Sequence, residues 1–600
     1  MAFAQPPPAT TPRMSRLKVR RPSGLQVVLL FLGVLVGGTV VVTVGRLALW
    51  AWHDYGTSIP SYYWSQVFDN GPMRQTLINT IVLVTISAFL ATVVAAILAW
   101  LNERTDASIG SVGRILPLIP FLMPALALPL GWLFLASPNA GTLNVIIRAA
   151  LKRVGITLTS GPLDIYSWPG LIFLYTVFLS GFAYLVLSSS MRNLDSGLEE
   201  AAALSGARSL RTLFRIVLPA LRPAMLTAFL VCFIVAVAMV SVPITIAPGA
   251  NISILAVVIV ERVTTRIPIP YGEAFLLGLL MLVPVLLAWT LQRRLAARGR
   301  FAVIGGRASG GARLRLGRWR RRVGRSIFLG FAFVAVVLPI LGLLYVSGLD
   351  FWMEGWPSRW SPLSHIRSAL QDPLIRGALI RSVGLGIATG AALMLVAHLL
   401  SYGQRLSPRL GRLVDALTKM PAVITHILIA IAILVTLGGR PFFLGGTIWI
   451  LFIGYFVCFI PFASVMTTGA HQEIGRDVVE AAKLAHASDA RTLRSIVTPL
   501  TRPALIAGFL LMYVLVSGET NASLILASTS QPVVGFVMLD LFNFASFPEV
   551  ASFALLITLV NLTAIAVFMK ILGTRGARDL GRRSSTRKII DRLIARLSSS

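Results

Sequence analysis

Long apolar runs recur twelve times along this sequence, and they restrict its fold more than any other feature. Each run is close to the ~20 residues that span a bilayer as an α-helix. The chain is 56% hydrophobic and only 13% charged, so a water-soluble globule could not bury its apolar surface. The sequence therefore predicts an all-α membrane protein with about 12 transmembrane helices.

The predicted spans fall into two sets of six. The first set is Leu25–Trp50, Leu77–Leu101, Ile115–Leu135, Pro169–Ser188, Ala224–Ile246 and Ala274–Leu291. The second set is Ile327–Gly348, Ala378–Leu400, Met420–Leu437, Thr447–Met466, Ala504–Leu526 and Ala551–Leu572. The stretch Asn251–Val260 is too short to span and favours a re-entrant or interfacial helix.

The net charge of +31 is explained by topology rather than by nucleic-acid binding. Most of the 54 Lys and Arg residues lie in the tails and loops on the side of the N-terminus, and ten lie in the opposite loops. Positive residues mark the cytoplasmic side and contact anionic headgroups. We therefore expect both termini to be cytoplasmic, with membrane lipid and no nucleic acid as a partner.

Cys232 and Cys458 are the only cysteines, and both lie inside predicted spans. They provide neither a disulfide framework nor metal-ligand spacing. No fixed metal site and no bound cofactor are predicted. The six scattered histidines also form no catalytic set, so a membrane-embedded enzyme is not favoured.

A charged segment occurs twice, once in each set of spans. "EAAALSGARSLRTLFRIVLP" covers residues 200–219 and "EAAKLAHASDARTLRSIVTP" covers residues 480–499. Over 26 aligned positions the two copies share 14 identities. Each copy lies between the fourth and fifth spans of its set, so the chain is predicted to be a parallel tandem repeat, with the pathway at the repeat interface.

The predicted organisation has five parts. They are a basic cytoplasmic tail (1–24), a first six-helix unit (25–291), a basic cytoplasmic linker (292–325), a second six-helix unit (326–572) and a second basic cytoplasmic tail (573–600). Each repeated segment is predicted to be a surface helix, a bend and a second helix that re-enters the membrane.

The repeated segment resembles the signature loop of ATP-binding-cassette importer permeases: EAA, three residues, G, nine residues, I, one residue, LP. The first copy matches it at Glu200, Ala201, Ala202, Gly206, Ile216, Leu218 and Pro219. The second copy matches it at Glu480, Ala481, Ala482, Ile496 and Pro499. It departs at His486, where glycine is expected, and at Thr498, where leucine is expected.

This resemblance implies a multi-pass permease of a bacterial inner (plasma) membrane. Each repeated segment would be a coupling helix on one of two ATPase copies, which would hold ATP and Mg, and an extracytoplasmic binding protein would deliver the substrate. None of the six lysines follows a glycine, so this chain has no phosphate-binding loop of its own. It is therefore expected not to be an enzyme. A secondary transporter driven by an ion gradient is the alternative from another class.

The substrate prediction rests on a finer resemblance. The stretch Glu103–Leu135, with Arg-Thr-Asp after the second span and a proline-rich third span, is similar to ferric-iron uptake permeases. This resemblance implies ferric iron as the substrate. Related fused permeases carry polyamines, thiamine or aminophosphonates, so these substrates remain open. The second half lacks Arg-Thr-Asp and has "YGQRLSPRLGR" instead.

Glu519 is predicted to lie well inside the eleventh span, beside Thr520 and Asn521. A carboxylate at this depth costs ~2.5–3.5 kcal/mol and is usually functional. We predict that these residues and His426 line the translocation pathway. A Glu hydrogen-bonded within its own bundle, and a His bonded to a backbone carbonyl, are the structural alternatives.

Overall fold

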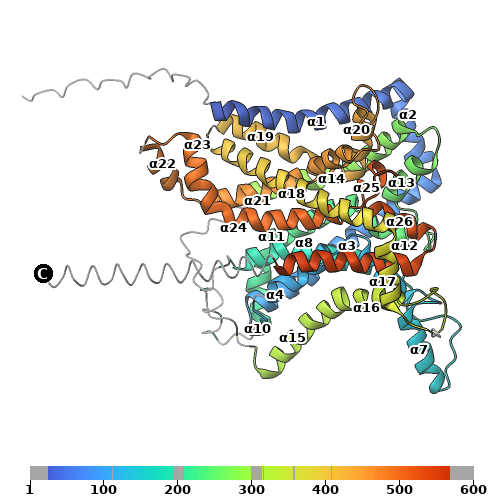
Figure 1. Ribbon diagram of the computed structural model, residues 1–600. Helices are drawn as coiled ribbons and strands as arrows, with labels where there is room; N and C mark the ends of the chain where they lie inside the picture. The colour runs from blue at the N-terminus through green and yellow to red at the C-terminus, as the bar shows by residue number, and fades with distance from the viewer. Residues whose placement is uncertain are drawn as a thin grey trace, which may run out of the picture.

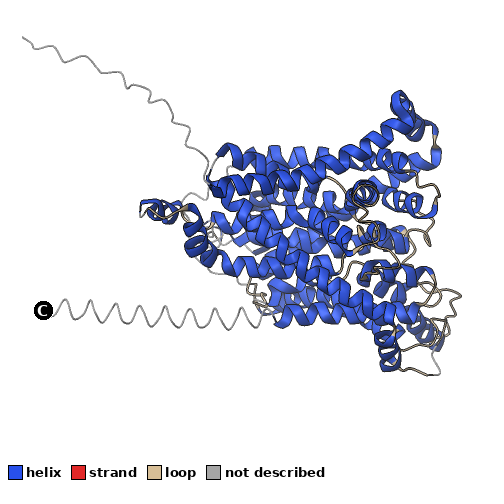
Figure 2. Cartoon of the chain, turned by 45° about the horizontal axis from the view of Figure 1, so that its top comes forward, coloured by secondary structure: helices blue, strands red, loops and turns tan. Residues whose placement is uncertain are grey.

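The computed structural model describes residues 24–110, 112–192, 209–298, 316–355, 359–406, 408–484 and 486–567, together with the single residues 194, 197, 202, 205 and 314. Within these residues the body consists of helices, with no strand beyond two isolated bridges (Figure 2). The predicted all-α fold is confirmed. Nearly all of the N-terminal tail, the whole C-terminal tail, and residues 299–313 and 315 of the predicted linker lie outside the described residues. The ends of the predicted linker, 292–298 and 318–325, are helical, so the linker is shorter than predicted.

Within the described chain, ten helices are long and apolar enough to cross a membrane. In the first half they are α1 (Gly24–Tyr55), α3 (Gly71–Glu103), α8 (Trp168–Arg192), α11 (Leu218–Ala238) and α14 (Tyr271–Arg298). In the second half they are α15–α16 (Arg318–Ala332 and Leu338–Val346, joined by 333–337), α18 (Pro373–Leu406), α21 (Ile448–Gln472), α24 (Thr498–Ser517) and the helix Phe547–Val567.

Two further spans are bent. In the first half, residues 112–122, which include α4 (Val112–Ile115) and α5 (Ile119–Leu122), meet α6 (Ala127–Ala136) at 86°. In the second half, residues 411–423, most of them in α19 (Pro408–Lys419), meet α20 (His426–Leu437) at 104°. If each bent pair is one crossing, the described chain has up to 12, as predicted.

The remaining helices are short, and most of them lie at the two ends of the bundle (Figure 1). At the left end are α10 (Ser209–Thr212), α22 (Arg476–Leu484) and α23 (Asp489–Thr492); toward the right end are α2 (Ile59–Trp64), α7 (Thr142–Arg153), α12 (Ser241–Ile246), α13 (Leu255–Thr265), α17 (Pro362–Gln371) and α26 (Val534–Asn543). The four-residue α25 (Ser523–Leu526) is buried inside the bundle. The described chain enters and leaves the bundle at the left end, as an even number of crossings requires. The predicted short element at 251–260 is α13, which begins slightly further along the chain.

The first helix of each half packs against helices of the other half. α1 packs against α19 and α20, and α16 packs against α6. These contacts are close because glycines replace side chains at them: a Cβ on Gly131 would lie 2.5 Å from the carbonyl oxygen of Pro339, and one on Gly342 would lie 2.5 Å from that of Gly131. The two halves therefore form one interlocked bundle.

Candidate substrate cavity and coupling segments

Two helix breaks face each other at the interface of the halves. α11 ends at Ala238 and α24 ends at Ser517. The prediction that the fifth and eleventh spans are continuous is therefore wrong. Apolar composition does not show a break, because the freed backbone groups find partners inside the protein. The Tyr175 hydroxyl donates to the Met239 carbonyl (3.4 Å), and Tyr455, its counterpart in the second half, bonds to the Ser523 hydroxyl (2.6 Å).

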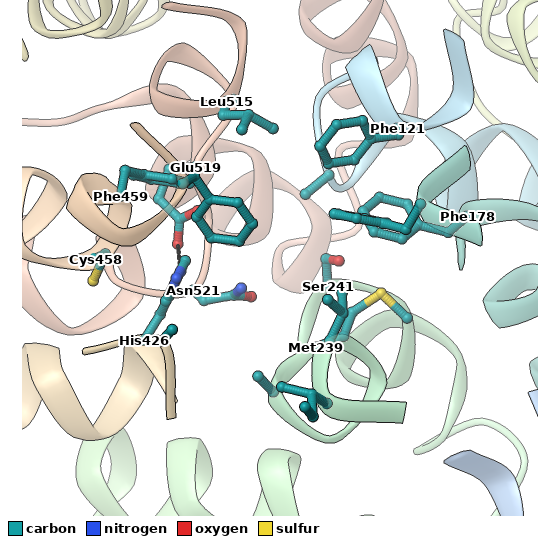
Figure 3. Close-up of a pocket in the computed structure, with 18 of the residues that line it drawn as sticks. Phe121, Phe178, Met239, Ser241, His426, Cys458, Phe459, Leu515, Glu519 and Asn521 are labelled. Carbon is teal, nitrogen blue, oxygen red and sulfur yellow. Dashed lines mark ion pairs between the residues drawn. The ribbon is translucent and has the colours of Figure 1, made fainter. Parts of the chain in front are cut away.

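A cavity of about 160 Å³ lies between the two breaks (Figure 3). Its walls come from both halves. The first half contributes Phe121, Met123, Ala125, Phe178, Phe182, Ile234, Val235, Ala238, Met239 and Ser241; the second contributes Pro421, Ala422, Ile424, His426, Cys458, Phe459, Phe462, Val514, Leu515, Gly518, Glu519 and Asn521. This location matches the pathway at the repeat interface that the tandem repeat predicts.

Glu519 is the single carboxylate among the described residues of this lining. It lies in the turn that joins α24 to α25, not within a membrane-spanning helix. One carboxylate oxygen, Oε1, accepts the Ala522 backbone N–H (2.9 Å) and lies 3.5 Å from Nδ1 of His426. The carboxylate is therefore held by local backbone on one side and faces the cavity with His426 on the other, as Figure 3 shows.

His426 and Asn521 each bring a polar atom without a hydrogen bond to this cavity. Nδ1 of His426 and Oδ1 of Asn521 are both buried, and no described group is a hydrogen-bond partner of either. The backbone-carbonyl partner considered for His426 is therefore not found for Nδ1 among the described residues. Nδ1 of His426 lies in ion-pair range of Glu519. Because buried polar groups are normally paired, Oδ1 of Asn521 is the atom best suited to contact a polar solute.

Thr520 does not line the cavity. A Cβ on Gly535 of α26 would lie 2.7 Å from the Cα of Thr520 and 3.0 Å from its hydroxyl oxygen. Thr520 therefore packs against α26. When the two repeated segments are aligned, the position equivalent to Glu519 is Met239, which also lines the cavity. The polar groups thus come mainly from one half of a symmetric frame.

The aromatic part of the lining was not predicted. Phe121, Phe178 and Phe182 of the first half pack on one another, with ring centroids 4.1–6.2 Å apart. Phe459 lies edge-on to His426 at 5.1 Å. In the sequence these residues resemble any apolar residue of a span, and only the bend at residues 123–126 brings Phe121 to the interface.

The second repeated segment forms the predicted helix, bend and helix. α22 carries Glu480, Ala481 and Ala482. α23 continues through a π-helical turn at Leu493–Val497, which contains Ile496, into α24, whose second residue is Pro499. Both short helices project beyond the bundle at its left end (Figure 1). Val478 and Leu484 of α22 are exposed, Leu484 to 82%. This apolar exposure on a projecting element is typical of a docking surface.

His486 makes the bend without glycine. Its φ is +54°, in the left-handed region that glycine favours, and the next backbone N–H, of Ala487, donates to Ala482 (3.0 Å). Ser488 then caps α23 by accepting from Arg491. The departure at His486 therefore does not abolish the bend.

The first repeated segment is described only in part. Glu200, Ala201 and Gly206 lie outside the described residues. Ala202 is buried, and Ile216, Leu218 and Pro219 are half-buried where the chain enters α11. The role of both segments in coupling stays a prediction.

Thr498, the other departure from the motif, belongs to a buried polar chain. Its hydroxyl lies 2.9 Å from Nε2 of His398, and Nδ1 of His398 lies 2.9 Å from Nε2 of His471. The equivalents of Thr498 and His471 in the first half are Leu218 and Met191. This series of hydrogen bonds joins α18, α21 and α24 next to the second repeated segment. No local sequence pattern could predict it, because its three members are far apart in the sequence.

The Arg-Thr-Asp stretch follows the end of α3 directly. Arg104 donates to the carbonyls of Met191 and Leu194, and the Asp106 carboxylate accepts the Leu316 backbone N–H. Leu314 pairs with the same stretch as an isolated bridge to Thr105. These three residues connect α3 to the chain after α8 and to the residues before α15; none of them lines the cavity.

Comparison with known proteins agrees with this architecture. The family model of the binding-protein-dependent transport system inner membrane component matches twice, at residues 91–300 and 382–577. The chain belongs to this family and has two fused units of an ATP-binding-cassette importer permease.

Several curated permeases are similar to it. A probable ABC transporter permease of Sinorhizobium fredii is 25% identical over 57% of this chain and 61% of its own length. A diacetylchitobiose uptake permease of Streptomyces coelicolor is 27% identical over 30% of this chain and 56% of its own. A phosphate transport permease of Mycobacterium tuberculosis is 26% identical over 38% and 77%. The chain thus spans little more than half of the first two relatives.

Proposed function

We propose that this chain is the complete transmembrane part of an importer in a bacterial inner membrane, and that it moves a cation from an extracytoplasmic binding protein to the cytoplasm. Two copies of a separate ATPase would dock on the two repeated segments. The observation that supports a cation as the substrate is the position of Glu519. It is the single carboxylate among the described residues that line the cavity at the interface of the halves. A buried carboxylate is stabilised best by a positive partner.

Orientation follows from charge. The described parts of the repeated segments and the first and last described residues lie at one end of the bundle, and the loops there are rich in Lys and Arg. This charge favours a cytoplasmic location for the coupling segments, where ATP is available. Membership of the permease family favours an ATPase-driven importer over a transporter driven by an ion gradient.

The cavity favours a small organic cation. The acceptors Glu519 and Asn521 lie at one side, and phenylalanine rings from both halves complete the wall. An ammonium group donates three hydrogen bonds and is attracted by ring faces, so an amine such as a polyamine, or thiamine, fits these walls. An aminophosphonate would bring a second anion beside Glu519 and is disfavoured.

Ferric iron is the second candidate, and it rests on the similarity of Glu103–Leu135 to ferric-iron permeases. Part of that similarity, Arg104–Asp106, lies away from the cavity and bears on assembly rather than on the ligand. Hard cations are held by several oxygen ligands, and among the described residues no group of three His, Cys, Asp or Glu could hold a metal ion.

The test is uptake by cells with and without this chain, using radiolabelled putrescine, thiamine and ferric iron in parallel. A partner ATPase is first captured with the chain from membranes, and its catalytically dead form serves as the control. Organic-cation uptake that requires both proteins supports the proposal. Uptake of iron alone would select the second candidate, and uptake of neither kind of cation would refute the substrate class while leaving the family assignment intact.

A further inference from the structure

The same turn precedes the coupling segment in both halves. After α8, the Leu194 backbone N–H donates to the Met191 carbonyl (3.3 Å); after α21, the Ile474 N–H donates to the His471 carbonyl (3.2 Å). The two turns occupy equivalent positions when the repeated segments are aligned. Each lies where a membrane helix ends and the chain leaves for its coupling segment, so each is the base of that segment.

An arginine from the second membrane helix of each half binds this turn. Arg104, at the end of α3, donates to Met191 (3.4 Å) and Leu194 (3.2 Å). Arg405, in the last turn of α18, donates to Ile474 (2.8 Å). Leu194 and Ile474 are equivalent residues, so the same contact is made twice from different local sequences.

The contact has a clear physical basis. The Met191 carbonyl belongs to the last turn of α8, whose carbonyls lack partners within the helix and carry partial negative charge. The Leu194 and Ile474 carbonyls lie two residues beyond the ends of α8 and α21, outside the helical hydrogen-bond pattern. A guanidinium satisfies them with directed N–H groups and remains charged. Arg104 is buried to 9% exposure, which strengthens its hydrogen bonds relative to those in water.

We propose that Arg104 and Arg405 are a matched pair of positioning residues that couple the ATPase-docking segments to the membrane helices. This inference rests on the proposed function of those segments. A segment held only by its flanking chain could shift without moving the bundle. An arginine bound to its base makes the segment and the second membrane helix move as one body.

Further contacts fix the second segment to the same helix. The Tyr402 hydroxyl of α18 donates to the Asp489 carbonyl of α23 (3.1 Å). Tyr402, Ile474, Leu493 and Val497 form a small hydrophobic cluster separate from the main core. The base of this segment is therefore packed as a unit, and Arg405 lies at its edge.

The experiment uses the full complex of chain, ATPase and binding protein in proteoliposomes, and measures substrate imported per ATP hydrolysed. Arg104→Gln and Arg405→Gln are expected to lower this ratio about tenfold while ATPase co-purification is unchanged. Arg104→Lys and Arg405→Lys keep a cationic donor and should retain most of the ratio. The matched controls are Arg74→Gln and Arg376→Gln, exposed arginines at the opposite ends of the same two helices.

The outcomes separate two kinds of failure. If the wild-type complex shows no substrate-dependent ATP hydrolysis, the proposed function fails. If the wild type is coupled and the Gln variants behave like the controls, the positioning role is refuted. A Lys variant as uncoupled as its Gln counterpart, in a complex that assembles normally, also refutes it, because a cationic donor would then not be what matters.

Discussion

At the scale of single residues, Glu519 combines a structural and a functional contact. It caps the turn before α25 through Ala522 and presents its charge to the cavity. Glu519→Gln keeps the shape and removes the charge. Since a hydrogen bond to a charged group contributes about 1.5–3 kcal/mol, cation uptake should fall about tenfold to a hundredfold.

Initial uptake rates at equal amounts of membrane protein measure this effect. Glu549→Gln, the same change at an exposed residue, is the control and should leave uptake unchanged. If Glu519→Gln transports as the wild type does, its carboxylate serves only the turn, and the cation proposal loses its main support.

Thr498 carries a prediction about stability. Thr498→Val leaves Nε2 of His398 without the hydroxyl that now lies 2.9 Å away. A buried polar group left unpaired costs about 1–3 kcal/mol, so the apparent Tm of the purified chain should fall. Thr498→Ser keeps the hydroxyl and should stay near the wild type; equal melting of the Val variant would show that the polar chain contributes nothing.

At the scale of elements, the crossing of α6 and α16 depends on two glycines. Gly342→Ala would place a Cβ 2.5 Å from the Gly131 carbonyl oxygen, so the helices must separate. Overpacking of this kind costs about 1–3 kcal/mol. Thermal unfolding in detergent should show a lower apparent Tm, whereas Gly384→Ala, where no atom lies within 4 Å, should not. An unchanged Tm for Gly342→Ala would mean that the contact yields easily.

The sequence predicted elements well where one local signal was sufficient. Apolar length located the crossings, and the repeat located the second coupling segment with its bend. Glu519 stood out because a lone carboxylate in an apolar run is costly. Phe121 and Phe178 did not stand out, because the sequence of an apolar span does not tell whether a given side chain faces lipid, the protein core or a cavity. Arg405 was not predicted to be the counterpart of Arg104 because the residues next to it in the sequence differ from those next to Arg104. Only the structure shows that the two arginines donate to carbonyls at equivalent positions.

At the scale of the whole molecule, each half should need the other in order to fold, but the two halves should not need to be joined by a peptide bond. α1 packs on α19 and α20, and α16 packs on α6, so each half buries a helix of the other. We expect fragments 1–310 and 311–600, co-expressed, to co-purify and to restore uptake. Either fragment alone leaves an interface uncovered and should be degraded or aggregate.

The cut falls between Gly310 and Gly311 so that Leu314 and Leu316 stay attached to the second half, where they can still pair with Thr105 and Asp106. Size-exclusion chromatography and uptake measure the result, with the uncut chain as reference. A fragment that alone accumulates as a monodisperse species would contradict the interlocked fold. Co-purification without uptake would instead show that the covalent linker itself contributes to transport, beyond holding the two halves together.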